Sequence, residues 1–62
     1  MKNGTEIAKF ANAEFGIESK VVTGSHGFHV TLRDTDADEF VPMVKCFKNE
    51  GDARQYAEFL VA

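Results

Sequence analysis

The first segment of the chain carries apolar residues at the spacing of a helix. Within residues 3–16, NGTEIAKFANAEFG, they recur every three or four positions and would form one stripe: Ile7, Phe10, Ala11 and Phe15. Asn3 or Thr5 can cap the start of this helix, and Gly16 follows it as a residue that commonly ends helices. The pattern predicts an amphipathic helix.

The middle of the chain changes to the pattern of strands. Residues 17–24, IESKVVTG, are rich in β-branched side chains. Residues 27–34, GFHVTLRD, alternate, so that Phe28, Val30 and Leu32 share one face. Because the two runs are connected through GSHG, residues 24–27, we expect a hairpin.

A third run, FVPMVKCFK over residues 40–48, has the composition of a strand but no clean alternation. Its apolar residues fall into two sets of opposite parity, with Phe40, Val44 and Cys46 in one and Val41, Met43 and Phe47 in the other. Pro42 cannot donate to a sheet ladder, so the strand lies at an edge or contains a bulge near this residue. Either set can face the core.

The last segment returns to helical spacing and completes the predicted fold. Residues 49–62, NEGDARQYAEFLVA, begin with Asn49 as an N-cap. The order α-β-β-β-α predicts an α+β fold in one domain over residues 1–62, with a three-stranded antiparallel sheet and two helices packed on one face. The predicted core is Ile7, Phe10, Phe15, Val30, Leu32, Tyr56 and Leu60.

Composition adds constraints on stability and compartment. A chain of 62 residues buries a small core, and association often supplies the missing stability. Cys46 is the single cysteine, which excludes an internal disulfide and favours a reducing compartment. The sequence has neither a membrane-spanning apolar run nor the apolar stretch of a signal peptide. We therefore expect a cytoplasmic protein.

The acidic stretch RDTDADEF, residues 33–40, has the alternating aspartates of a calcium loop but lacks its other features. Counted from Asp34, the positions that need glycine and a bidentate glutamate hold Glu39 and Lys45. His26 and His29 lie three residues apart, which on a strand places them on opposite faces. We therefore predict no metal site, and we interpret Cys46 as structural.

Catalytic chemistry has no support in the sequence. There is no Ser-His-Asp order, no phosphate-binding glycine loop before a helix, and no base identified beside Cys46. We predict a protein that is not an enzyme and needs no cofactor.

Nucleic-acid binding is the alternative function. The predicted element order resembles that of double-stranded-RNA-binding domains, whose second helix begins with a lysine cluster, but here that position reads NEGDAR. The net charge of −3 also opposes phosphate binding. What remains is an exposed strand face with His29, Arg33, Lys45 and Phe47, which a single strand could contact.

The surplus of apolar residues in the third strand favours protein binding. In a two-layer fold one set stays outside, and an outer patch with methionine and phenylalanine is typical of a protein contact. Size, acidity and predicted architecture resemble the small accessory proteins of bacteriophages, such as anti-CRISPR proteins, which implies inhibition of a host complex in the host cytoplasm. Self-association into a homodimer is a further expectation. The predicted contact residues are Asp34, Asp36, Asp38, Glu39, Val41, Met43 and Phe47.

Overall fold

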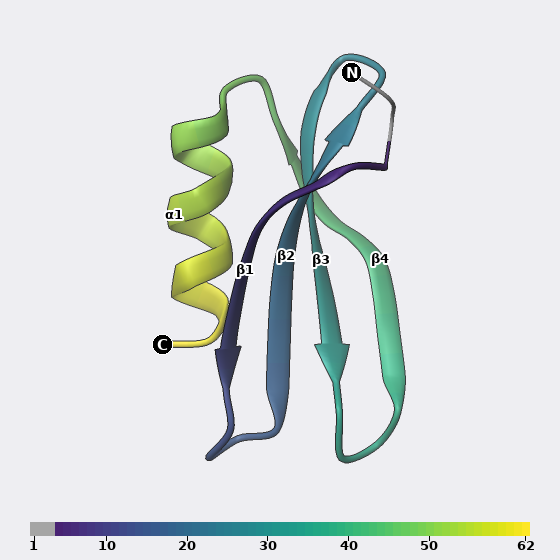
Figure 1. The fold of residues 1–62 in the computed structure, drawn as a ribbon, viewed down its shortest axis with the longest axis vertical. Helices are drawn as coiled ribbons and strands as arrows, with labels where there is room; N and C mark the ends of the chain where they lie inside the picture. The colour runs from purple at the N-terminus through teal and green to yellow at the C-terminus, as the bar shows by residue number, and fades with distance from the viewer. Residues whose placement is uncertain (1–3) are drawn as a thin grey trace.

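The computed structural model describes residues 4–62, which form four strands and one helix. The elements are β1 (Glu6–Asn12), β2 (Ile17–Gly24), β3 (Gly27–Asp34), β4 (Glu39–Phe47) and α1 (Glu50–Leu60). Neighbouring strands are all antiparallel, and the sheet order β1-β2-β3-β4 follows the chain (Figure 1). The connections between strands are too short for parallel crossovers, which explains this topology.

The core lies between α1 and the two central strands. Val21 and Val30 are cross-strand partners, and both are fully buried beneath Ala53 and Ala57 of α1. The small alanine side chains let the helix approach the sheet closely, and the Ser19 hydroxyl donates a hydrogen bond of 2.6 Å to the Ala57 carbonyl oxygen. Partly buried residues surround this centre: Ile7, Ala8, Phe10, Phe28, Phe47, Tyr56 and Leu60.

The predicted helix over residues 3–16 is wrong, and so is the fold that followed from it. Residues 6–12 form β1, which pairs with β2. Gly16, which was interpreted as the end of this helix, has a φ of 64° in a turn, where the Asn12 side chain accepts a hydrogen bond from the Glu14 amide. Pairing with the free edge of β2 outweighs the helical spacing of the segment. The cap predicted at Asn3 lies outside the described residues.

The other predicted elements are present. The strands over residues 17–24 and 27–34 are confirmed, and a two-residue turn joins them. The second predicted helix is also confirmed, with the Asn49 side chain accepting a 2.8 Å hydrogen bond from the Asp52 amide. The structure is therefore a four-stranded antiparallel sheet with one helix, in place of three strands and two helices.

The predicted core is confirmed in part. Val30 is fully buried, and Ile7, Phe10, Tyr56 and Leu60 pack around the centre, while Leu32 is half-buried. Phe15 is 60% exposed because it lies in the β1–β2 turn and not on a helix. Phe47, which the sequence assigned to a contact surface, belongs to the ring of partly buried residues.

The connections lie at the two ends of the sheet. The β1–β2 turn and the acidic β3–β4 loop lie at one end, and the β2–β3 turn lies at the other (Figure 1). Thr35 connects the β3–β4 loop to the β1–β2 turn, because its amide and its hydroxyl both donate to the Gly16 carbonyl oxygen, at 2.8 and 2.9 Å. The acidic loop is therefore fixed to the neighbouring turn.

Candidate functional site

The acidic loop is a structured hairpin connection. Residues 35–38 join β3 to β4, and Asp34 and Glu39 pair at its base. The Asp34 carboxylate accepts hydrogen bonds of 3.0 Å from the amides of Asp36 and Ala37, which holds the turn in shape. Asp38 has a left-handed φ of 53°, a conformation that aspartate tolerates better than most residues.

The four acids of this loop do not have equivalent surroundings. Asp34 holds the turn, and Asp38 forms an ion pair of 3.0 Å with Arg33. Asp36 and Glu39 have no ion-pair partner among residues 4–62, and both are exposed. Two of the four predicted contact carboxylates are therefore available to an external cation.

Exposed apolar side chains concentrate on β4, directly after this loop. Phe40, Val41 and Met43 are 57%, 45% and 55% exposed. β4 is an edge strand, because it pairs only with β3. We call Phe40, Val41 and Met43 the β4 patch; it runs along the edge strand and over both faces, because Phe40 pairs with Arg33 and Val41 with Leu32, and such neighbours point to opposite sides of the sheet. It contains two of the three apolar residues predicted as contacts, and Phe40, which the sequence placed in the other set.

Phe47 does not belong to the β4 patch. The centre of the Phe47 ring lies 5.4 Å from that of Tyr56 on α1, and the Lys45 ammonium lies 5.4 Å from the centre of the Phe47 ring. The register between β3 and β4 shifts between the pairs Val30–Lys45 and Leu32–Val41, so strict alternation along β4 is lost. The bulge expected near Pro42 is therefore confirmed, and it separates Phe47 from the patch.

The residues of the alternative nucleic-acid face do not form one surface. Lys45 packs over the rings of Phe47 and Tyr56 on the helix side of the sheet. His29 pairs with Cys46, one position along from the Phe28–Phe47 pair, and therefore lies on the opposite face. Arg33 is engaged by Asp38. The proposed combination of cations and an aromatic ring is thus divided between two faces.

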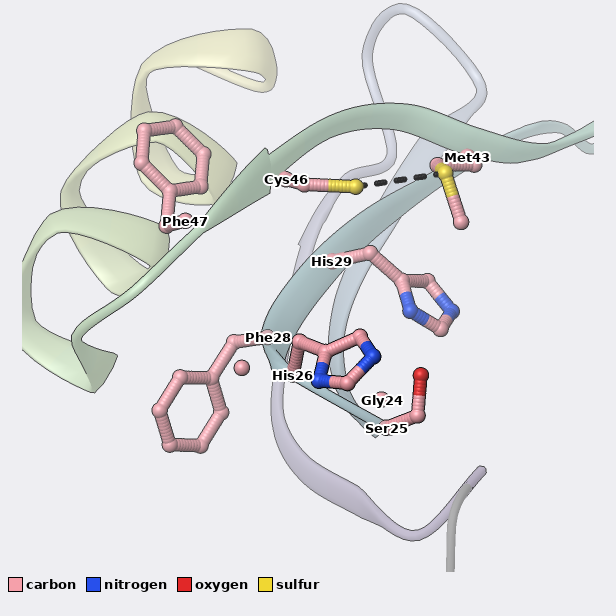
Figure 2. A pocket seen from close by; sticks show the side chains of 9 residues that line it. Gly24, Ser25, His26, Phe28, His29, Met43, Cys46 and Phe47 are labelled. Carbon is pink, nitrogen blue, oxygen red and sulfur yellow. Dashed lines mark hydrogen bonds between the residues drawn. The ribbon is translucent and has the colours of Figure 1, made fainter.

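A cavity of about 190 Å³ opens at the other end of the sheet, beside the β2–β3 turn. His26, His29, Met43 and Cys46 are among the residues that line it (Figure 2). The separation of the two histidines to opposite faces holds only on a strand; His26 lies in the turn and His29 on β3, and both line the same cavity. In residues 4–62 no group of three or more His, Cys, Asp or Glu side chains is placed to hold a metal ion.

Sequence reasoning missed the proximity of Met43 and Cys46. The Cys46 thiol donates to the Met43 thioether, with 3.2 Å between the sulfur atoms, although residues three apart on a regular strand point to opposite faces. The shift of register in β4 accounts for the contact. Pro42 was the one signal in the sequence that the strand is irregular here.

Comparisons with family models, with curated proteins and with solved structures found no match to this chain. The part of the chain that the structure describes contains no helix with the length and apolar character needed to cross a membrane.

Proposed function

We propose that this chain is a small non-enzymatic protein-binding module that acts by occupying a surface of a partner protein complex. The observation that supports this most strongly is the β4 patch, in which three large apolar side chains lie exposed on one edge strand. Exposed apolar clusters rimmed by charge are typical of protein contacts. Burial of these side chains against a partner would supply most of the affinity.

The acidic loop supports a partner with a basic surface. Glu39 directly precedes Phe40, and Asp36 lies in the loop that leads into β4, so the two unpaired carboxylates border the patch. Charged groups at the rim of an interface mainly increase the rate of association and favour the correct orientation. A host protein that handles nucleic acid has such a surface, in keeping with the resemblance to phage-encoded inhibitors.

The rigidity of the site also supports the proposal. The hydrogen bonds of Asp34 within the loop and of Thr35 to Gly16 hold the loop in place before any partner arrives. A preformed surface loses less conformational entropy on binding. The backbone that carries the free carboxylates is therefore preformed next to Phe40.

Contact through side chains is favoured over the addition of a strand to β4. Pro42 lacks an amide proton, and the shift of register bends the edge, so a regular ladder cannot extend along it. A second copy of the chain is the competing occupant of the patch. Sedimentation of the purified protein over a range of concentrations distinguishes a homodimer from a monomer that awaits another protein.

The test uses tagged protein to capture partners from native extract, with and without nuclease. The double variant Phe40→Ser with Met43→Ser removes the apolar surface. Phe59→Ser is the matched control, because Phe59 is 72% exposed but lies on α1. We expect one captured protein that resists nuclease, is retained by the control and is lost from the double variant. Capture that survives the double variant but disappears with nuclease would refute the proposal.

A further inference from the structure

We propose that Cys46, Met43 and His29 form a binding site for a soft monovalent metal ion, of which Cu(I) is the biological example. This inference shares Met43 with the β4 patch, but its test uses the protein alone and needs no protein partner. It starts from the cavity beside the β2–β3 turn, where a thiol, a thioether and two imidazoles line one space (Figure 2).

The backbone positions these donor groups. His29 and Cys46 are direct cross-strand partners, so their side chains leave the same face of the sheet side by side. The irregular register of β4 then places Met43 against Cys46, with 3.2 Å between the sulfur atoms. A Cβ at Gly24 would lie 3.4 Å from His29 Nδ1, so the imidazole lies beside β2, and it must rotate toward β4 to join the two sulfur atoms as a ligand.

The imidazoles are available as ligands. Neither the imidazole of His26 nor that of His29 forms a hydrogen bond or an ion pair with another described residue. Figure 2 shows both rings on the side of the cavity onto which the Met43 side chain projects. His29 is the nearer candidate because it is paired with Cys46, and His26 borders the site from the turn.

The donor types select the ion. Thiolate and thioether sulfur are soft ligands that favour Cu(I), and imidazole also suits copper. Structural zinc sites use four ligands, usually thiolates and imidazoles, and thioether is not among them. Among the described residues no carboxylate lines the cavity, which disfavours calcium and magnesium. The site offers three donors, of which two are sulfur, and this small, soft ligand set matches a soft monovalent ion.

Binding needs one proton transfer and a small movement. The S–H bond of Cys46 breaks, the proton passes to water, and the sulfur lone pair forms the bond to the metal, which keeps its oxidation state. The sulfur atoms must separate somewhat to admit an ion, since metal–sulfur bonds are about 2.3 Å each. Met43 can make this movement because it is exposed and its side chain has three rotatable bonds.

Ag(I) is the probe, because it is soft, monovalent and stable to oxidation. It is titrated into isotopically labelled protein while NMR follows the Met43 methyl group and the ring of His29. We expect saturation at one equivalent, with both groups shifted, and no such change with zinc. Cys46→Ser should abolish binding. Met43→Leu and His29→Gln should each weaken it by about tenfold or more, since even partners outside the ligand shell contribute about 10- to 100-fold.

Phe40→Leu is the control on the same strand, because Phe40 is exposed and does not line the cavity. It should bind Ag(I) like the wild type. If Met43→Leu and His29→Gln also bind Ag(I) like the wild type, the Cys46 thiol alone coordinates the ion and the proposal is wrong. The unmodified protein decides the matter even if a variant fails to fold, because direct coordination shifts the Met43 methyl and the bound His29 nitrogen much more than an ion held by the thiol alone would.

Discussion

Replacement of Phe47 by alanine tests the assignment of this ring to the core. The ring packs on Tyr56 with 5.4 Å between centroids, and Lys45 lies over both rings at 5.4 and 5.5 Å. Full truncation of a buried phenylalanine costs about 3–5 kcal/mol, and a half-buried ring should lose about 2–3 kcal/mol. The stability of a chain of 62 residues is about 3–9 kcal/mol in total, so Phe47→Ala should remove a large fraction of it.

The assay is thermal and urea unfolding followed by circular dichroism. A loss of about 2–3 kcal/mol corresponds to a fall in Tm of about 10–20 °C in a domain of this size. Phe40→Ala is the matched control on the same strand, and because Phe40 is exposed we expect a change within about 0.5 kcal/mol. A double-mutant cycle with Tyr56→Ala should give a coupling of about 0.5–1.5 kcal/mol. If Phe47→Ala is no more destabilising than Phe40→Ala, the placement of Phe47 in the core is refuted.

Three further predictions concern a turn, a hydrogen bond in the core and the effect of metal ions. Gly16→Ala should lower the free energy of unfolding by about 1–3 kcal/mol, because the φ of Gly16 is 64° and a Cβ would collide with the Asp36 carboxylate. Gly51→Ala in α1 is the control and should be neutral or stabilising. Equal effects of the two substitutions would contradict the turn geometry. Ser19→Ala should lower the free energy of unfolding by about 1–3 kcal/mol, since it removes the buried hydrogen bond to Ala57, and an unchanged Tm would show that this bond contributes nothing. Calcium or zinc should leave Tm unchanged, because no group of suitable ligands was found in residues 4–62, and a shift of several degrees at micromolar metal would refute this.

The parts of the fold that the sequence predicted correctly carry local signals. Residues 27–34 alternate cleanly, and their partner strand is rich in β-branched residues. Asn49 and Asp52 mark the start of α1 through hydrogen bonds three residues apart, which any isolated helix would form. These features depend on near neighbours in the chain, so the sequence alone is sufficient to find them.

The first segment shows why local signals fail elsewhere. Its apolar spacing fits a helix, yet Phe10 reaches the core from a strand. What decides the outcome is the unpaired edge of β2, which lies outside the segment itself. Gly16 was interpreted as the end of a helix, and glycine fits both that position and the turn with positive φ that it occupies.

The candidate site was predicted in part for a similar reason. The acidic loop is the exposed hairpin tip that the sequence indicated, since its four acids lie at the β3–β4 connection. The division of the β4 residues between two surfaces depends on a shift of register of the kind that Pro42 suggested, but its position is fixed only by pairing with β3. Phe47 was therefore misplaced, and the contact between Met43 and Cys46 was not anticipated.

The central claim is that the β4 patch supplies affinity and that the acidic loop supplies steering. The measurement that tests it most directly is the Kd and association rate for the captured partner at low and high salt. Phe40→Ser with Met43→Ser should weaken binding at both salt concentrations, mainly through faster dissociation. Asp36→Asn with Glu39→Gln should slow association and flatten its salt dependence with a smaller effect on Kd. Glu50→Gln with Glu58→Gln makes the same change in net charge on α1, away from the acidic loop, and should have little effect. If loop neutralisation weakens binding more than loss of the patch does, the protein works by charge mimicry and the assignment of the β4 patch is wrong.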